Sequence, residues 1–236
     1  MKPYYETKNV RLYCGDCFDV LSFLPLSYFD AIVTDPPYAT AGGNSNGRAS
    51  GEDTQFWQFW FTRVWNETVK HCQQNAFALI HCDWRMLGAL CASISQGIDR
   101  MTTSSWRASQ VLTWNRQHIG MGSPYRNSTE NIVFCRGPNW KRKADFPRDI
   151  GTVVEYFWAY GSHRFHSAEK PGGLYNKLLT PHGPKAILDL FAGSGPVLRY
   201  CDQNDIDAVG IERDERNCEQ AAIRLSEPKQ EKLLEV

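Results

Sequence analysis

The 236-residue chain has no hydrophobic run long enough to cross a membrane. A membrane-spanning helix needs about 20 consecutive apolar residues, and none of the apolar stretches approaches that length. Residues 1–11 also lack the apolar segment of a secretory signal. These absences predict a protein of the cytoplasm without a membrane partner.

The chain also lacks a net charge, because 26 Lys and Arg residues balance 26 Asp and Glu residues. Bulk electrostatics therefore gives no sign of a nucleic-acid partner. The local distribution is less even, since one basic stretch is interleaved with Trp140 and Phe146. Its residues are Arg136, Lys141, Arg142, Lys143 and Arg148. Such a stretch is either a solvated charged face or a surface for phosphates and unstacked bases.

The eight cysteines do not form the repeated pairs of a disulfide framework or a zinc site. Cys14 and Cys17 make one Cys-x-x-Cys pair, and no second such pair exists. Most of the cysteines lie inside apolar runs, such as residues 77–82. In a chain of ordinary size we expect reduced, buried thiols and no metal site.

Hydrophobic residues make up 42% of the chain, which is enough for one substantial core over residues 1–236. Short runs rich in β-branched and aromatic residues predict strands at 30–34, 76–81, 110–114, 131–135, 186–191 and 208–211. Helix-like segments lie between them, at 55–75, 84–96 and 213–225. This alternation predicts a single α/β domain with a mainly parallel central sheet.

A glycine turn follows the predicted strand at 186–191 and leads into an apolar helix-like segment. Gly193 and Gly195 would let the backbone approach a ligand closely, and Asp189 would orient the turn or bind the ligand. The third glycine of the dinucleotide fingerprint is absent, which weakens a nicotinamide or flavin interpretation. Glu212 ends the next predicted strand, where an acid either accepts hydrogen bonds from ribose or caps a helix. The combination favours a nucleoside-bearing cofactor.

The segment Asp35-Pro36-Pro37-Tyr38 follows another predicted strand. The two prolines stiffen the exit from the strand and leave carbonyl groups free to accept hydrogen bonds. Asp35 adds a carboxylate acceptor and Tyr38 a flat ring, which suits an amino group attached to a planar heterocycle. Acceptors around such an amine favour its pyramidal form, which can attack an electrophilic methyl group. The alternative is an ordinary proline turn.

These motifs resemble those of the S-adenosylmethionine-dependent DNA amino-methyltransferases of the β group. In that family an Asp-Pro-Pro-Tyr motif precedes a Phe-x-Gly-x-Gly cofactor motif, as it does here. The segments "GDCFDVLSFLPLSYFDAIVTDPPY", "NSTENIVFCRG" and "SAEKPGGLYNKLL" also resemble family segments. The resemblance covers most of the chain and implies a Rossmann-like methyltransferase fold with a permuted motif order.

The resemblance implies site residues position by position. The catalytic residues would be Asp35, Pro36, Pro37 and Tyr38. The residues around S-adenosylmethionine would be Asp16, Asp189, Phe191, Gly193, Gly195 and Glu212. Pro196 and Val197 depart from the family, which commonly has small hydroxyl residues there. Residues 136–166 are expected to form a small target-recognition insertion.

The expected partner is DNA, and the target base must be flipped out or single-stranded to reach Asp35. Phosphate contacts would offset the cost of extrusion, and the candidates are the basic stretch, Arg48 and Arg164. Many relatives are dimers, so a homodimer is possible. Asp at the first position of the motif favours adenine N6 over cytosine N4 by resemblance.

Four other functions can be weighed against these motifs. A cytosine carbon-5 methyltransferase would need a nucleophilic thiol, commonly in a Pro-Cys pair, and the chain has no Pro-Cys. Protein-glutamine and RNA amino-methyltransferases usually place the glycine motif first, so the motif order argues against them. A DNA-binding relative without catalysis would not need Asp35 and Tyr38 beside an intact glycine turn.

Overall fold

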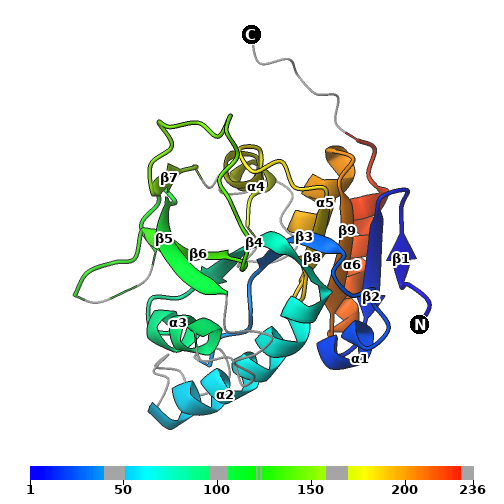
Figure 1. Ribbon diagram of the computed structural model, residues 1–236, viewed down its shortest axis with the longest axis horizontal. Coiled ribbons are helices and arrows are strands. Elements are labelled where there is room, and N and C mark those ends of the chain that lie inside the picture. Colours follow the sequence, from blue (N-terminus) through cyan, green and yellow to red (C-terminus); the bar gives the residue numbers. More distant parts are fainter. Residues whose placement is uncertain (40–50, 96–105, 121, 123, 158–169, 230–236) are drawn as a thin grey trace.

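The computed structural model describes residues 1–39, 51–95, 106–120, 122, 124–157 and 170–229. Within them, a nine-stranded sheet runs through the centre of the molecule in the order β1-β2-β9-β8-β3-β4-β6-β5-β7 (Figure 1). The strands are β1 (Tyr5–Glu6), β2 (Val10–Cys14), β3 (Phe29–Thr34), β4 (Cys72–Cys82), β5 (Arg107–Asn115), β6 (Thr129–Arg136), β7 (Val153–Glu155), β8 (Ala186–Asp189) and β9 (Asp207–Glu212). The predicted α/β fold is confirmed.

The strands β2, β9, β8, β3 and β4 are successive parallel neighbours, so their carboxyl ends meet at one edge of the sheet. β6 reverses direction and pairs antiparallel with both β4 and β5. The amino end of β6 therefore lies at the same edge as the carboxyl ends of its neighbours. This edge is where the loops of an open α/β sheet bind ligands.

Helices cover both faces of the sheet (Figure 1). The helical elements are α1 (Cys17–Leu21), α2 (Gly51–Thr68), the 3-10 turn η1 (Val69–His71), α3 (Leu87–Ser95), α4 (Gly172–Leu179), α5 (Pro196–Gln203) and α6 (Glu215–Ser226). Apolar side chains of α1, α2 and α3 pack in one core cluster, and those of α4, α5 and α6 pack in a second. The sheet separates the two clusters.

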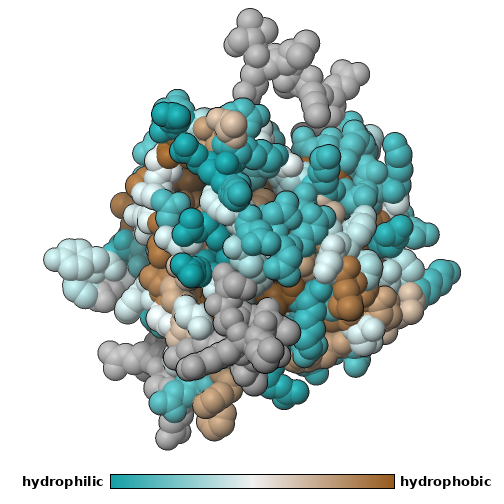
Figure 2. Space-filling view, in the orientation of Figure 1, coloured by the Kyte–Doolittle hydropathy of each residue, from teal (hydrophilic) through white to brown (hydrophobic). Residues whose placement is uncertain are grey.

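The strand sequences explain why both faces are covered. In β4, Phe77 and Leu79 belong to one core cluster, whereas Ala78 and Ile80 belong to the other. Successive side chains of a strand point to opposite faces, so a run without polar residues needs apolar partners on each side. Figure 2 shows a mainly hydrophilic outer surface on the face in view, with smaller hydrophobic areas.

The sequence places the end of the first long helix too late. α2 ends at Thr68 and β4 begins at Cys72, so residues 72–75 form a strand where a helix was predicted. The backbone N–H groups of Ser27 and Tyr28 donate to carbonyls of the turn between α2 and β4, at 3.0 and 2.8 Å. This pairing holds the start of β4 beside β3, and tertiary contacts override the local helical pattern.

The segment predicted as a target-recognition insertion is described as far as residue 157. Near its start, the Gly137 N–H donates to the Ala76 carbonyl at 2.9 Å, and near its described end β7 lies parallel to β5. Both ends of the described part are thus attached to the central sheet. Among the described helices, none is long and apolar enough to span a membrane.

Candidate active site

The loops at the carboxyl edge of the sheet bring together most of the predicted site residues. Asp35 follows β3, the glycine turn follows β8, and Glu212 ends β9. The Gly15 N–H donates to the Glu212 carbonyl at 2.8 Å, which ties the loop holding Asp16 to the end of β9. Residues more than 150 positions apart in the sequence thus surround one site.

The glycine turn has a backbone conformation that favours glycine at two positions. Gly193 and Gly195 have φ values of +52° and +76°. A Cβ atom on Gly195 would lie 2.9 Å from the Cβ of Ala221 in α6, whereas a Cβ on Gly193 would meet nothing within 4 Å. Gly195 therefore permits close packing against α6, and Gly193 borders open space that a ligand can enter.

The carboxylate of Glu212 closes the glycine turn. Its Oε2 accepts from the Gly193 N–H at 2.8 Å, and its Oε1 accepts from the Asp214 N–H at 2.8 Å. A carboxylate has about four lone-pair positions, so two remain available for hydroxyl donors. Asp16 is the N-cap of α1, and its side chain accepts from the Phe18 N–H at 2.9 Å.

Asp189 joins the two strands that carry the main motifs. Its Oδ1 accepts from the Thr34 hydroxyl at 2.8 Å and from the Phe191 N–H at 3.2 Å. The side chain is fully buried, and burial raises its pKa to about 7. Of the two roles considered for Asp189, orientation of the glycine turn is the one that these bonds perform.

Asp35 is a half-buried carboxylate with a donor on each oxygen. The Tyr38 hydroxyl donates to Oδ1, and the Lys170 ammonium donates to Oδ2 at 2.8 Å. Burial favours the neutral acid, but the charge of Lys170, a smaller effect of His81 and these hydrogen bonds outweigh it and hold the pKa of Asp35 below its usual value. Asp35 is therefore ionised at neutral pH.

Lys170 and Glu130 are site residues that the sequence analysis missed. Lys170 Nζ lies 3.1 Å from Glu130 Oε2, and Glu130 Oε1 lies 3.5 Å from Arg116. The signal was present, because Lys170 and Glu130 lie within two of the segments that resemble the family. The sequence assigned neither residue a chemical role, because nothing in the residues around them shows that they contact Asp35.

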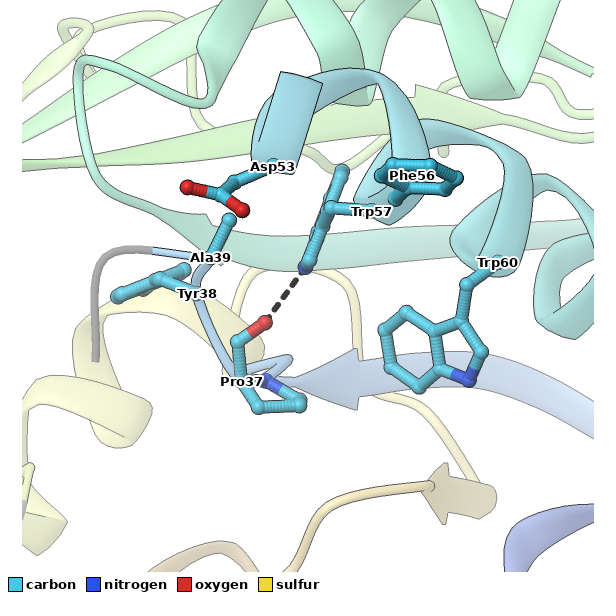
Figure 3. Close-up of a pocket in the computed structure, with 7 residues that line it drawn as sticks. All are labelled: Pro37, Tyr38, Ala39, Asp53, Phe56, Trp57 and Trp60. Atoms are coloured by element: carbon cyan, nitrogen blue, oxygen red, sulfur yellow. Dashed lines mark hydrogen bonds between the residues drawn. The ribbon is translucent and has the colours of Figure 1, made fainter. Parts of the chain in front are cut away.

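A pocket of about 400 Å³ opens beside the catalytic motif (Figure 3). The loop after β3 and the helix α2 contribute its lining, which consists of Pro37, Tyr38, Ala39, Asp53, Phe56, Trp57 and Trp60. The Trp57 Nε1–H donates to the Pro37 carbonyl at 2.6 Å and so holds the loop against α2. The volume lies within the range typical of small-molecule sites.

The aromatic cluster of α2 connects this pocket with the glycine turn. The rings of Trp57 and Phe61 are stacked at 4.9 Å, and the ring of Trp60 lies 5.6 Å from that of Phe191. The sequence predicts a helix-like segment at 55–75 that contains these aromatic residues, but it offers no reason to place them in the site. Flat apolar walls of this kind suit a planar ring system.

The basic stretch lies away from Asp35. Arg136 pairs with Phe77, while Asn131 pairs with Cys82 at the catalytic edge, so β6 carries Arg136 toward the opposite edge of the sheet. The Lys143 ammonium lies 3.3 Å from the carbonyl of Gly183, which precedes β8.

The remaining basic residues of the stretch, Lys141, Arg142 and Arg148, are exposed. Arg48 and Arg164 lie outside the described residues. Contact of these residues with DNA, like the homodimer, stays a prediction.

The order of these elements along the chain matches a known family. A family model described as DNA methylase (N6_N4_Mtase) matches residues 29–223, which is most of the chain. This chain belongs to the DNA methylase family. The methylase is 25% identical over 205 residues to an Escherichia coli (strain K12) protein named as a methylase, YubD, covering 86% of this chain and 84% of that protein.

Solved structures show that the methylase has a methyltransferase fold. PvuII DNA methyltransferase (cytosine-N4-specific) matches with a TM-score of 0.77 and 14% identity, covering 98% of this chain and 91% of that chain. The M1.HpyAVI–SAM complex matches with a TM-score of 0.66 and 17% identity, covering 92% and 100%. The predicted Rossmann-like fold is confirmed, with the catalytic motif preceding the glycine motif.

The methylase is S-adenosylmethionine-dependent, as its family is, and its site fits that cofactor. Gly193 borders open space, and the Glu212 carboxylate has acceptor capacity left for ribose hydroxyls. Among the described residues, no cluster of three or more His, Cys, Asp or Glu could hold a metal ion. The site supplies acceptors and aromatic surfaces for a nucleoside.

Proposed function

We propose that this DNA methylase transfers a methyl group from S-adenosylmethionine to the exocyclic N6 amino group of adenine in DNA. The supporting observation is the ionised Asp35 carboxylate at the end of β3, directly beside β8 and its glycine turn. The family supports DNA as the substrate. The choice of adenine rests on the resemblance at the first position of the Asp-Pro-Pro-Tyr motif.

In this proposal Asp35 and the Pro36 carbonyl accept the two N–H groups of the target amine. The Tyr38 ring stacks on the base, and its hydroxyl fixes the Asp35 carboxylate. Acceptors placed around the amino group concentrate its lone pair on nitrogen, where it can attack. The cofactor supplies an electrophilic methyl group bonded to a sulfonium.

The electron balance of the transfer is simple. The nitrogen lone pair forms the new N–C bond, and the electron pair of the broken C–S bond goes to sulfur. The nitrogen then carries a positive charge, which the Asp35 carboxylate stabilises until one N–H proton passes to water. Because the pKa of Asp35 is below its usual value, the carboxylate acts here as a hydrogen-bond acceptor and counter-charge.

The test is incubation of the purified protein with DNA and methyl-labelled cofactor, followed by nucleoside digestion and mass analysis. We expect N6-methyladenine as the product. N4-methylcytosine would replace the adenine proposal with the cytosine-N4 alternative. DNA binding without transfer to any base would support the inactive relative.

The first variant that tests the proposal is Asp35→Ala. We expect it to lower the rate of transfer at least about 1000-fold while cofactor affinity persists, because Asp35 is assigned to the target amine. Single-turnover rates and calorimetric cofactor binding measure the two effects. Asp19→Ala, which removes an exposed carboxylate of α1, is the control. Loss of cofactor affinity in the Asp35 variant would mean that the two sites are assigned wrongly.

A further inference from the structure

Lys170 lies between two carboxylates that belong to distant parts of the chain. Its ammonium lies 2.8 Å from Asp35 Oδ2 and 3.1 Å from Glu130 Oε2. The Lys170 side chain is only 7% exposed, whereas those of Asp35 and Glu130 are 30% and 25% exposed. The cation is thus nearly removed from water, while the carboxylates still border the open side of the site.

The ion pairs of Lys170 with Asp35 and Glu130 are unsuited to a purely stabilising role. Removing a lysine from water costs several kcal/mol, and its attraction to carboxylates often does no more than repay this cost. Burial disfavours the ammonium, yet the attraction of Asp35 and Glu130 outweighs that effect and raises the pKa of Lys170. The charge is held where it acts on the one carboxylate assigned to the target amine.

The two donors on Asp35 also fix its orientation. The Tyr38 hydroxyl occupies one position on Oδ1 and the Lys170 ammonium occupies one on Oδ2. A carboxylate accepts about four hydrogen bonds, so one position on each oxygen remains for an incoming N–H group. A carboxylate anchored at both oxygens cannot rotate freely away from the amine.

We propose that Lys170 is a positioning residue for methyl transfer, which orients the Asp35 carboxylate and keeps it ionised while Glu130 holds the ammonium in place. This inference rests on the proposed function, because it takes Asp35 as the acceptor for the target amine. Arg116, 3.5 Å from Glu130, completes the row of alternating charges.

Several other described groups lie near Asp35, and none of them supplies a second strong positive charge at neutral pH. His81 in β4 is buried with no hydrogen-bond partner for either ring nitrogen in the described part of the chain. Burial and the nearby Lys170 lower its pKa to about 4, so it is neutral at pH 7. In the described part of the chain, the remaining titratable groups in electrostatic contact with Asp35 are Tyr38, Cys82, Tyr175 and Asp189. Among the residues that the structure describes, Lys170 is therefore the main positive charge acting on Asp35.

Removal of the ammonium has a specific consequence. Asp35 and Glu130 both contact the same nitrogen, so without it two carboxylates face each other a few ångströms apart. Like charges at this separation raise the pKa of one member of the pair. Asp35 would then be protonated at a pH where the wild-type protein holds it ionised.

The experiment compares Lys170→Met, Glu130→Gln and the double variant with the wild-type protein. We expect Lys170→Met to lower the single-turnover rate about 100-fold at neutral pH and to move the acidic limb of the pH profile upward by about one unit or more. Cofactor affinity should stay within about threefold of wild type, since Lys170 is assigned to Asp35. In the double variant the acidic limb should return toward its wild-type position, because the second carboxylate is gone.

Two controls separate positioning from general stabilisation. Lys70→Met removes an exposed ammonium that pairs with Glu67 at 2.8 Å, and it should leave the rate and the pH profile unchanged. Lys170→Arg keeps the charge, so the acidic limb should stay in place even if the rate falls. If Lys170→Met does not fold, an upward shift of the limb in Lys170→Arg would overturn the inference.

A measurement without turnover keeps this inference separate from the proposed function. Carbon-13 NMR of labelled Asp carboxyls, with Asp35 assigned from Asp35→Asn, should show a higher pKa for Asp35 in Lys170→Met than in the wild type. An unchanged pKa overturns the inference, whatever the activity. Absence of transfer by the wild-type protein, with this shift present, would refute the proposed function alone.

Discussion

The carboxyl group of Asp189 links two parts of the site that lie 155 residues apart in the sequence. It accepts from the Thr34 hydroxyl of the catalytic strand and from the Phe191 N–H of the glycine turn. Burial disfavours the charged form of Asp189 more than its two donors favour it, so the balance raises its pKa. The protonation state of Asp189 is thus set by its surroundings in the folded protein.

Asp189 gives a prediction about stability and pH. Its pKa is raised to about 7, whereas an unfolded Asp titrates near 3.9. Between these values the folded protein holds a proton that the unfolded chain has released, so this contribution to the free energy of unfolding falls as pH rises from about 4 to about 7, by about 1.4 kcal/mol per unit. Asp189→Asn keeps an acceptor oxygen but does not titrate.

We therefore expect Asp189→Asn to be more stable than the wild type at pH 8, with a difference that shrinks toward pH 4. Urea denaturation at several pH values measures it. Asp145→Asn, at an exposed position between β6 and β7, is the control. A difference that is the same at all pH values would show that Asp189 does not titrate in this range.

At the scale of single elements, the turn between β8 and α5 shows that two glycines of one motif have different tasks. Both have positive φ values, but only Gly195 lies where a side chain would meet α6. The close approach of α6 and α5 depends on that space. Gly193 instead leaves room on the side where the cofactor is expected.

The matched variants Gly195→Ala and Gly193→Ala test this division. We expect Gly195→Ala to lower the free energy of unfolding by about 2–4 kcal/mol, because strain at positive φ adds to a steric clash with Ala221. Gly193→Ala should cost about 1–2 kcal/mol and weaken cofactor binding more strongly. Urea denaturation and calorimetry measure the two effects. Equal losses of stability in both variants would contradict the assigned packing role of Gly195.

At the scale of the whole molecule, the sheet directs the two charged regions to different edges. Asp35, Lys170 and Glu130 lie at the carboxyl edge of the parallel strands, whereas β6 carries the chain toward the opposite edge before the basic stretch begins. A DNA surface that includes both regions has to extend along the molecule. The basic stretch is therefore expected to affect affinity without touching the reacting groups.

The triple variant Lys141→Ala, Arg142→Ala and Lys143→Ala tests this prediction. The salt dependence of DNA binding should weaken by about 0.9 in the logarithmic slope for each DNA phosphate that the variant no longer neutralises. The rate at saturating DNA should stay unchanged. Lys70→Ala, at an exposed lysine near the end of α2, is the control. An unchanged slope in the triple variant would identify the stretch as a solvated face.

The sequence by itself determined the fold class, the order of the motifs and the strand exits that carry them. These features are encoded locally, because proline and glycine restrict or free the backbone at particular positions and apolar runs mark buried strands. The Asp-Pro-Pro-Tyr segment and the glycine turn could be placed for that reason. The boundary between α2 and β4 could not, since pairing with the chain before β3 decides it.

Only the tertiary structure decided which side chains meet. Lys170 is 135 residues from Asp35 in the sequence, and nothing near either residue indicates the other. The tertiary structure also decided that aromatic side chains of α2 lie beside Tyr38. It likewise decided that the basic stretch lies away from the site. A contact between distant segments depends on strand order and direction, which are set by the packing of the whole sheet rather than by any local pattern.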